Sequence, residues 1–290
     1  MNSPRGPNVV VVGSLNLDVI VRAELRPDPG ETVLGSDYEE AVGGKGLNQA
    51  VAASRVGPTA IVGAIGSDAA GAVLRRHLES RGVDVSSLDV SNGPTGRAII
   101  IVTPDGENSI VVAPLANSLV RPDCVVAALD RLCGAALLAQ REVPAAVVAA
   151  AATWAADHGV RFVLNPSPVH GLDPALLRCA DPLIVNVHEA RAILGAAASV
   201  GGEDLARGIV DATVSTVVTA GAAGSWIASG GVAEFVPAVA DVRVVDTTGA
   251  GDEFAGSLAA HLAEGCDLLL AARRATRAAA RVVATPRADR

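Results

Sequence analysis

Short runs of valine and isoleucine alternate with alanine-rich stretches of helical spacing along most of this 290-residue chain, and this alternation limits the possible fold most. The pattern predicts buried strands at 8–13, 59–65, 161–164, 183–185 and 213–219, and helices at 45–56, 145–158, 189–194 and 205–210. Strands that alternate with helices form a parallel sheet that is covered on both faces. We therefore expect a three-layer, doubly wound α/β fold with a mainly parallel sheet.

The composition agrees with a core of this kind. Half of the residues are hydrophobic but only 2% are aromatic, so the core must consist of alanine, valine, leucine and isoleucine. No low-complexity linker divides the chain. We expect residues 1–290 to form a single domain.

Two regions interrupt the alternation of strands and helices. Residues 19–42 and 97–112 contain strand-like segments separated by the turn signals at 27–30 and 104–108, with no helix between them. They predict antiparallel hairpins, added to the α/β core over about 15–42 and 96–113, that form a small antiparallel lid or interface flap.

Charge and cysteine content exclude several classes of protein. The net charge of -8 and the pI near 5.1 argue against a non-specific nucleic-acid binder. The most apolar stretch, 145–152, is far shorter than the roughly 20 residues of a membrane-spanning helix, and the polar first seven residues contain no apolar signal core. The four cysteines form no CxxC pair, so we expect free thiols in a cytoplasmic protein that contacts neither membranes nor nucleic acids.

The glycine-rich run at 246–256 is the strongest candidate for chemistry. A strand is expected at 242–245 and a helix from the run to about 264, which places the glycines where a strand meets a helix. Free N–H groups and the helix dipole form an anion site at such a junction. Asp252 in the first helical turn could then take a proton from a hydroxyl during phosphoryl transfer. The alternative is that Asp252 only caps its helix.

Two further clusters lie where strands end. Gly43-Gly44-Lys45-Gly46-Leu47-Asn48 offers backbone approach and polar donors to a polyol, but it also fits a tight turn with a solvated lysine. Asp18 follows the first strand, where open α/β sheets bind ligands, but it also fits an ordinary turn. The chain contains neither a Walker A loop nor a GxGxxG after the first strand.

Together these stretches resemble the PfkB carbohydrate kinase family, and within it the ribokinase branch. The Gly-Gly-Lys-Gly-x-Asn stretch at 43–48 and the Asp-Thr-x-Gly-Ala-Gly-Asp stretch at 246–252 match its two signature regions. The resemblance runs from about Val9 to about Ala284 in consistent order and spacing.

The resemblance implies a role for each matching residue. It implies that Asp252 is the catalytic base, beside an anion hole of Gly249, Ala250 and Gly251. It implies sugar contacts for Asn16, Asp18, Gly44, Lys45, Asn48, Glu142, Ala98 and Ile100, the last two at lid positions. It implies phosphate and nucleotide contacts for Asn186, Glu189, Thr219, Gly221 and Gly224, with Glu189 reaching Mg²⁺ through water. Asp246 and Thr248 match half of a monovalent-cation site.

The chain departs from the family pattern at two places. Leu115 stands where ribokinases commonly have glycine, so it could narrow the pocket or shift its loop. In the 284–290 segment, Ala284-Thr285-Pro286-Arg287-Ala288-Asp289-Arg290, an arginine stands about where relatives have a glycine in the loop that helps to hold a potassium-like cation. We therefore expect a weak or absent response to potassium.

The function implied is transfer of the ATP γ-phosphoryl group to a primary hydroxyl of a pentose, most directly from ribose to ribose 5-phosphate, with Mg²⁺. A nucleoside, deoxyribose or a hexose remains possible as the acceptor. A catalytically weak sugar-binding regulator is the alternative from another class. The resemblance also implies a homodimer that forms through the lid.

Overall fold

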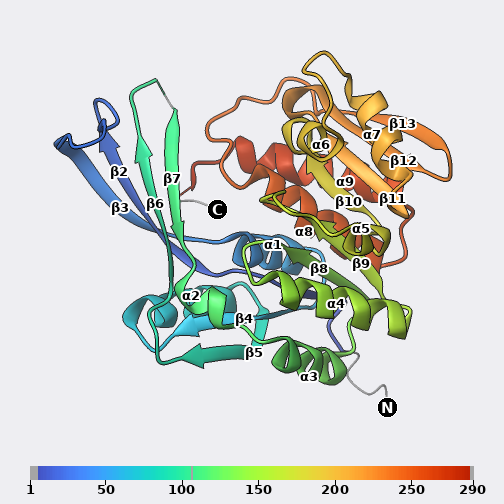
Figure 1. The fold of residues 1–290 in the computed structure, drawn as a ribbon, viewed down its shortest axis with the longest axis horizontal. Helices are drawn as coiled ribbons and strands as arrows, with labels where there is room; N and C mark the ends of the chain where they lie inside the picture. Colours follow the sequence, from blue (N-terminus) through green and yellow to red (C-terminus); the bar gives the residue numbers. More distant parts are fainter. Residues whose placement is uncertain (1–5, 106, 288–290) are drawn as a thin grey trace.

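The computed structural model describes residues 6–105 and 107–287 as an α/β fold built on two sheets (Figure 1). Within these residues the larger sheet has nine strands, in the order β13-β12-β11-β10-β9-β8-β1-β4-β5. The strands are β1 (Val9–Val12), β4 (Thr59–Gly66), β5 (Val83–Ser91), β8 (Ala136–Gln140), β9 (Arg161–Asn165), β10 (Leu183–Asn186), β11 (Ser215–Thr219), β12 (Gly224–Ser229) and β13 (Val232–Pro237). Strands β11 to β5 in this order run parallel, while β12 and β13 form an antiparallel edge.

Helices cover both faces of the larger sheet (Figure 1). One face packs against α3 (Pro122–Leu132), α4 (Ala145–His158), α5 (Pro174–Arg178), α6 (Val187–Leu194) and α7 (Gly202–Val210). The other packs against α1 (Lys45–Ser54), α2 (Ala69–Ser80), α8 (Ala250–Ala263) and α9 (Leu268–Val283). Successive strand residues point to opposite faces, so Val10 and Val12 join the first core and Val9 and Val11 the second. The expected three-layer, mainly parallel fold is confirmed.

The smaller sheet contains β3 (Gly35–Gly43), β2 (Asn16–Ala23), β6 (Gly96–Val102) and β7 (Asn108–Ala113), in that order. β2–β3 and β6–β7 are antiparallel pairs, as the two turn signals predict, but the pairs join through β2 and β6, which run parallel. In Figure 1 these blue and green strands project from one side of the larger sheet. Two short 3₁₀ turns, η1 (Leu115–Leu119) and η2 (Gly221–Ala223), complete the regular structure.

One predicted strand is wrong. Residues 242–245 form a loop before α8, held to the end of α9 where Val245 N–H donates to the Val283 carbonyl at 2.7 Å. Val244 and Val245 are 58% and 48% exposed, so this apolar pair has no place in a sheet. In the part of the chain that the structure describes, no helix is both long and apolar enough to cross a membrane.

The parallel strands bring their carboxyl ends to one edge of the larger sheet. Gln140, Asn165 and Asn186 end β8, β9 and β10, and Ser14 follows β1. The amino-terminal ends of α1 and α8 meet this edge, since α1 packs against both α8 and the strands. Residues that are far apart in the sequence therefore face one another there.

Candidate active site

Asp252 lies in the first turn of α8 and is buried, with 9% of its surface exposed. Its Oδ2 accepts a hydrogen bond from Asn48 Nδ2 at 3.0 Å, and its Oδ1 accepts one from Gln49 Nε2 at 2.9 Å. Burial raises the pKa of Asp252 above its ordinary value, and the charge of Lys45 and these two donors oppose that rise. The N-cap position of α8 is Gly249, at φ 75°, and no side chain caps the helix, so the interpretation of Asp252 as a simple helix cap is wrong.

Gln49 is a functional candidate that the sequence did not single out. It is completely buried, and its Nε2 donates both to Asp252 and to Asn165 Oδ1, the latter at 3.1 Å. Its Oε1 accepts from Gln140 Nε2 at 2.6 Å, and Asn165 Nδ2 donates to the Ile184 carbonyl at 2.9 Å. These hydrogen bonds fix which side of the Gln49 amide faces Asp252. The only local signal is its position directly after the 43–48 motif.

Asp18 lies inside β2, not in a turn as one interpretation had it, and it is also buried. Burial raises its pKa, while the hydrogen bond and charge of Arg287 lower it. A Cβ atom at Gly43 would lie 2.3 Å from Asp18 Oδ2, so only glycine leaves room for this carboxylate. Gly44 has a φ of 90°, which also favours glycine at the start of α1.

Glu142 joins the start of α1 to the end of β1. Its Oε2 accepts from Ser14 Oγ at 2.5 Å and from the Lys45 N–H at 3.1 Å. The Lys45 side chain is half-buried, so the solvated-lysine interpretation is wrong. Burial alone would lower the pKa of Lys45, but the negative charges of Asp252, Glu142 and Glu189 raise it above the ordinary value.

A cavity of about 160 Å³ lies between Lys45, Asp252 and the carboxyl ends of β9, β10 and β11. Its lining includes Lys45, Asn165, Asn186, Glu189, Thr219, Gly249, Gly251 and Asp252. Asn186 and Glu189 form a capping box at the start of α6, with Glu189 N–H donating to Asn186 Oδ1 and Asn186 N–H to Glu189 Oε2, both at 2.9 Å. They are thus a capped helix start, as their local sequence suggests, and also line the cavity beside Asp252.

The remaining predicted residues lie at the edges of this site. Asn16 and Ala98 are buried at the base of the smaller sheet, and Ile100 lies half-buried further along β6. Ala250 begins α8. Gly221 begins η2 and Gly224 follows it, and neither is among the residues that line the 160 Å³ cavity. Asp246 lies in the loop before α8, where its Oδ1 accepts a hydrogen bond from the Thr248 N–H at 2.8 Å.

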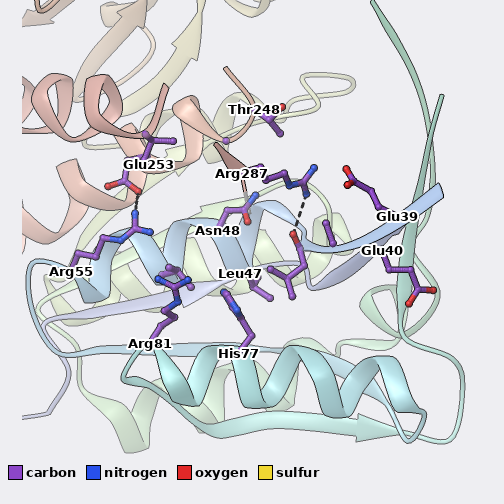
Figure 2. A pocket seen from close by; sticks show the side chains of 15 residues that line it. Glu39, Glu40, Leu47, Asn48, Arg55, His77, Arg81, Thr248, Glu253 and Arg287 are labelled. Atoms are coloured by element: carbon purple, nitrogen blue, oxygen red, sulfur yellow. Dashed lines mark hydrogen bonds and ion pairs between the residues drawn. The ribbon is translucent and has the colours of Figure 1, made fainter. Parts of the chain in front are cut away.

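A second cavity, of about 420 Å³, opens on the other side of Gly249 (Figure 2). β3, α1, α2, α8 and the end of α9 contribute its walls. Figure 2 shows Arg55 paired with the buried carboxylate of Glu253, and Arg287 extended toward β3. His77 lies among these groups, and burial followed by the charges of Arg81 and Arg55 lowers its pKa.

The model of the pfkB family carbohydrate kinases matches residues 7–290 of this chain. A ribokinase from Bacillus subtilis is 34% identical over 275 residues, which are 94% of this chain and 91% of that protein. The structure of a ribokinase from Thermotoga maritima has a TM-score of 0.87 and 28% identity, and covers 96% of this chain and 93% of its own. The Arabidopsis thaliana ribokinase, complexed with ribose and ATP, has a TM-score of 0.84 and 29% identity over 97% of this chain and 94% of its own.

Proposed function

This chain belongs to the pfkB family of carbohydrate kinases, and we propose that it transfers the γ-phosphoryl group of ATP to O5 of ribose. The relatives support ribose as the acceptor, since they are ribokinases and one of them was solved with ribose and ATP. The observation that carries the proposal is the position of Asp252, between the two donors of α1 and the cavity that Asn186 and Glu189 line. A base held there can reach a hydroxyl on one side and a phosphoryl group on the other.

In the proposed reaction, Asp252 accepts the proton of the attacking hydroxyl while that oxygen bonds to the γ-phosphorus and the bond to the leaving oxygen of ADP breaks. The N–H groups of Gly249 and Gly251 and the positive end of α8 stabilise the charge on the transferred group. The resemblance also implied the Ala250 N–H for this role, but in this structure it donates to the Thr247 carbonyl at 3.2 Å. General-base catalysis of this kind contributes about 10²–10⁴-fold.

The sugar would lie between the base of the smaller sheet and α1. Asp18, Asn16, Gly44, Asn48 and Glu142 supply acceptors and donors for its hydroxyls, with Ala98 and Ile100 as apolar walls. The smaller sheet is then the lid that excludes water from the reaction, within one domain.

The side chains of the site decide whether a magnesium ion fits there. No group of three or more histidine, cysteine, aspartate and glutamate side chains suited to a metal ion occurs among residues 6–105 and 107–287. A magnesium ion that arrives with ATP needs only one or two carboxylates, because it keeps several waters. Glu189 fits, since only its Oε2 is engaged in the capping box. Bound there, Mg²⁺ would neutralise phosphate charge; Asn186, Thr219, Gly221 and Gly224 would contact the phosphates.

Three finer features belong to the same proposal. Exposed apolar residues on β6 and β7 (Ile99, Ile110, Val111 and Val112) support a homodimer that forms through the lid. Location in the cytoplasm is supported by the four free cysteines. A weak potassium response is supported by the Val283 carbonyl beside Asp246, which already accepts from the N–H groups of Val245 and Asp246. Ala288, Asp289 and Arg290 of the same segment lie outside the described residues.

The test is ADP release with a panel of pentoses, hexoses and nucleosides, in the wild type and in Asp252→Asn. We expect turnover with ribose above all, and Asp252→Asn should bind ribose normally while losing about 10²-fold or more in kcat. An Asp252→Asn variant with near-wild-type kcat would disprove the base assignment. Turnover with a nucleoside but not with ribose would disprove the acceptor.

A further inference from the structure

Arg287 reaches from the segment after α9 to the base of the lid (Figure 2). Its Nη2 donates to Asp18 Oδ2 at 2.7 Å and to the Val42 carbonyl at 3.1 Å. We infer that Arg287 is a positioning residue for the sugar site: it holds the Asp18 carboxylate and the strand that leads into Gly43 in the geometry that binds the sugar hydroxyls. This inference rests on the proposed function.

The contact leaves Asp18 able to bind a ligand. Arg287 uses a single nitrogen, whose two hydrogens go to Asp18 Oδ2 and to the Val42 carbonyl. Asp18 Oδ1 accepts no hydrogen bond from any residue that the structure describes. A carboxylate has about four lone-pair sites, so a sugar diol can bind Oδ1 while Arg287 remains on Oδ2. Arg287 therefore supports the Asp18 carboxylate without blocking the oxygen that binds the sugar.

The contact also joins three separate parts of the chain. Asp18 lies on β2 and Val42 on β3, which are paired in the lid with Leu17 opposite Val42. Val42 directly precedes Gly43, against which the Asp18 carboxylate packs. The side chains of Arg287 and Asp18 are only 25% and 11% exposed, so water screens this ion pair less than it would an exposed pair. Loss of Arg287 should loosen both walls of the sugar site together.

The charges around Asp18 give Arg287 a second effect. Asp18 faces the carboxylates of Glu142 and Asp252 as well as Arg287, and burial with these two negative charges raises its pKa. Arg287 opposes that rise, because an adjacent positive charge favours the ionised form. A sugar diol needs an acceptor, so protonation of Asp18 weakens binding. Without Arg287, Asp18 should take up its proton at a higher pH. As the pH falls, sugar binding should therefore begin to weaken at a higher pH than in the wild type.

The experiment compares wild type, Arg287→Ala and Arg287→Lys, with Arg281→Ala as the matched control. Arg281 lies exposed in the last turn of α9, so its loss removes the same charge without touching the lid. The measurements are kcat and KM for ribose at saturating ATP, ribose affinity by calorimetry without nucleotide, and KM between pH 5 and 8. Circular dichroism and melting temperature check that each variant is folded.

We expect Arg287→Ala to raise KM and the ribose Kd about tenfold, with kcat changed by less than about twofold, because Asp252 and the anion hole are untouched. Its KM should rise further toward acid pH, starting at a higher pH than in the wild type. Arg287→Lys should recover part of the loss, and Arg281→Ala should match the wild type.

Two outcomes overturn the inference. Unchanged KM and Kd in a folded Arg287→Ala would mean that the contact does not position Asp18. A lower KM would mean that Arg287 competes with the sugar. If the wild type neither binds nor phosphorylates ribose, the proposed function fails instead, and the calorimetric arm separates the two cases.

Discussion

Gln49→Met tests whether a buried hydrogen-bond chain holds the catalytic carboxylate. The substitution keeps the length of the side chain but removes its amide. Asp252 Oδ1 then loses the donor at 2.9 Å, Asn165 Oδ1 loses its donor at 3.1 Å, and Gln140 Nε2 loses its acceptor at 2.6 Å. Asn48 remains as the donor to Asp252 Oδ2.

The expected effect on stability follows from the groups left unpaired. Each buried donor or acceptor without a partner costs about 1–3 kcal/mol, so the buried Gln140 Nε2 and Asp252 Oδ1 together cost about 2–6 kcal/mol. That is a large part of the roughly 5–15 kcal/mol by which a domain is stable. At roughly 2–4 °C per kcal/mol, the melting temperature should fall by roughly 5–20 °C.

Gln140→Met provides the internal comparison. Gln140 Oε1 is buried without a hydrogen-bond partner among the described residues, so this substitution also removes a group that is already unsatisfied. Replacing both partners of a buried hydrogen bond by apolar groups can be nearly neutral. The double variant should therefore be no less stable than Gln49→Met, and the cycle should give a favourable coupling of about 1 kcal/mol or more.

The assays are thermal denaturation of the four members of the cycle and the pH dependence of kcat. Gln49 is one of the donors that oppose the raised pKa of Asp252, so its loss should move the acid limb of kcat to higher pH. Gln140→Met should move that limb less, because it does not touch Asp252. A Gln49→Met enzyme with wild-type melting temperature and a wild-type acid limb would refute the argument.

Three further expectations follow from single features of the structure. Because burial raises the pKa of Asp252 above 3.8, kcat should begin to fall at a higher pH than it would with an ordinary aspartate as the base. A pH–rate profile in which kcat falls only at pH 3.8 or below contradicts this. Leu115 has a φ of 46°, which costs a side chain roughly 1–2 kcal/mol, and Leu115→Gly relieves that strain. Glycine adds about 0.4–1 kcal/mol of unfolded-state entropy and removes a half-buried leucine side chain worth about 1 kcal/mol or more, so Leu115→Gly should be no more stable than the wild type in denaturant titrations, and a gain above about 1 kcal/mol contradicts this. Potassium should change turnover by less than about twofold in sodium-free buffer, and strong activation would show that the cation site is complete.

The order of strands and helices could be predicted because buried parallel strands have a simple local pattern. The α4 helix over Ala145–His158 and β1 over Val9–Val12 agree with the pattern within a residue or so. The failed strand at 242–245 shows the limit of that pattern, because a run of valines indicates apolarity and not the presence of a neighbouring strand. Here the Val245 N–H donates to the Val283 carbonyl at the end of α9 and not to a neighbouring strand.

The residues of the candidate site also differ in whether the sequence could predict them. Asp252 could be chosen from sequence because a glycine-rich turn precedes it, and Asp18 because it follows the first strand. Gln49 and Arg287 could not, since their roles depend on partners 203 and 269 residues away. Arg287 lies in the segment for which the family resemblance implied only a doubtful cation site, and it contacts Asp18 and Val42.

The charge distribution of the site separates its two substrates. Asp18, Glu142 and Asp252 are close enough for their charges to affect one another, and they surround the proposed position of the sugar. A neutral polyol binds such acceptors, whereas phosphates are repelled by them. Gly249 and Gly251, at the start of α8, line the 160 Å³ cavity, where the positive end of the helix favours an anion. Lys45 lines the same cavity, and the negative charges of Asp252, Glu142 and Glu189 favour its charged form. We therefore expect the sugar to bind on the side of Asp18 and Glu142 and the phosphates of ATP on the side of Gly249 and Gly251, with Asp252 between the two.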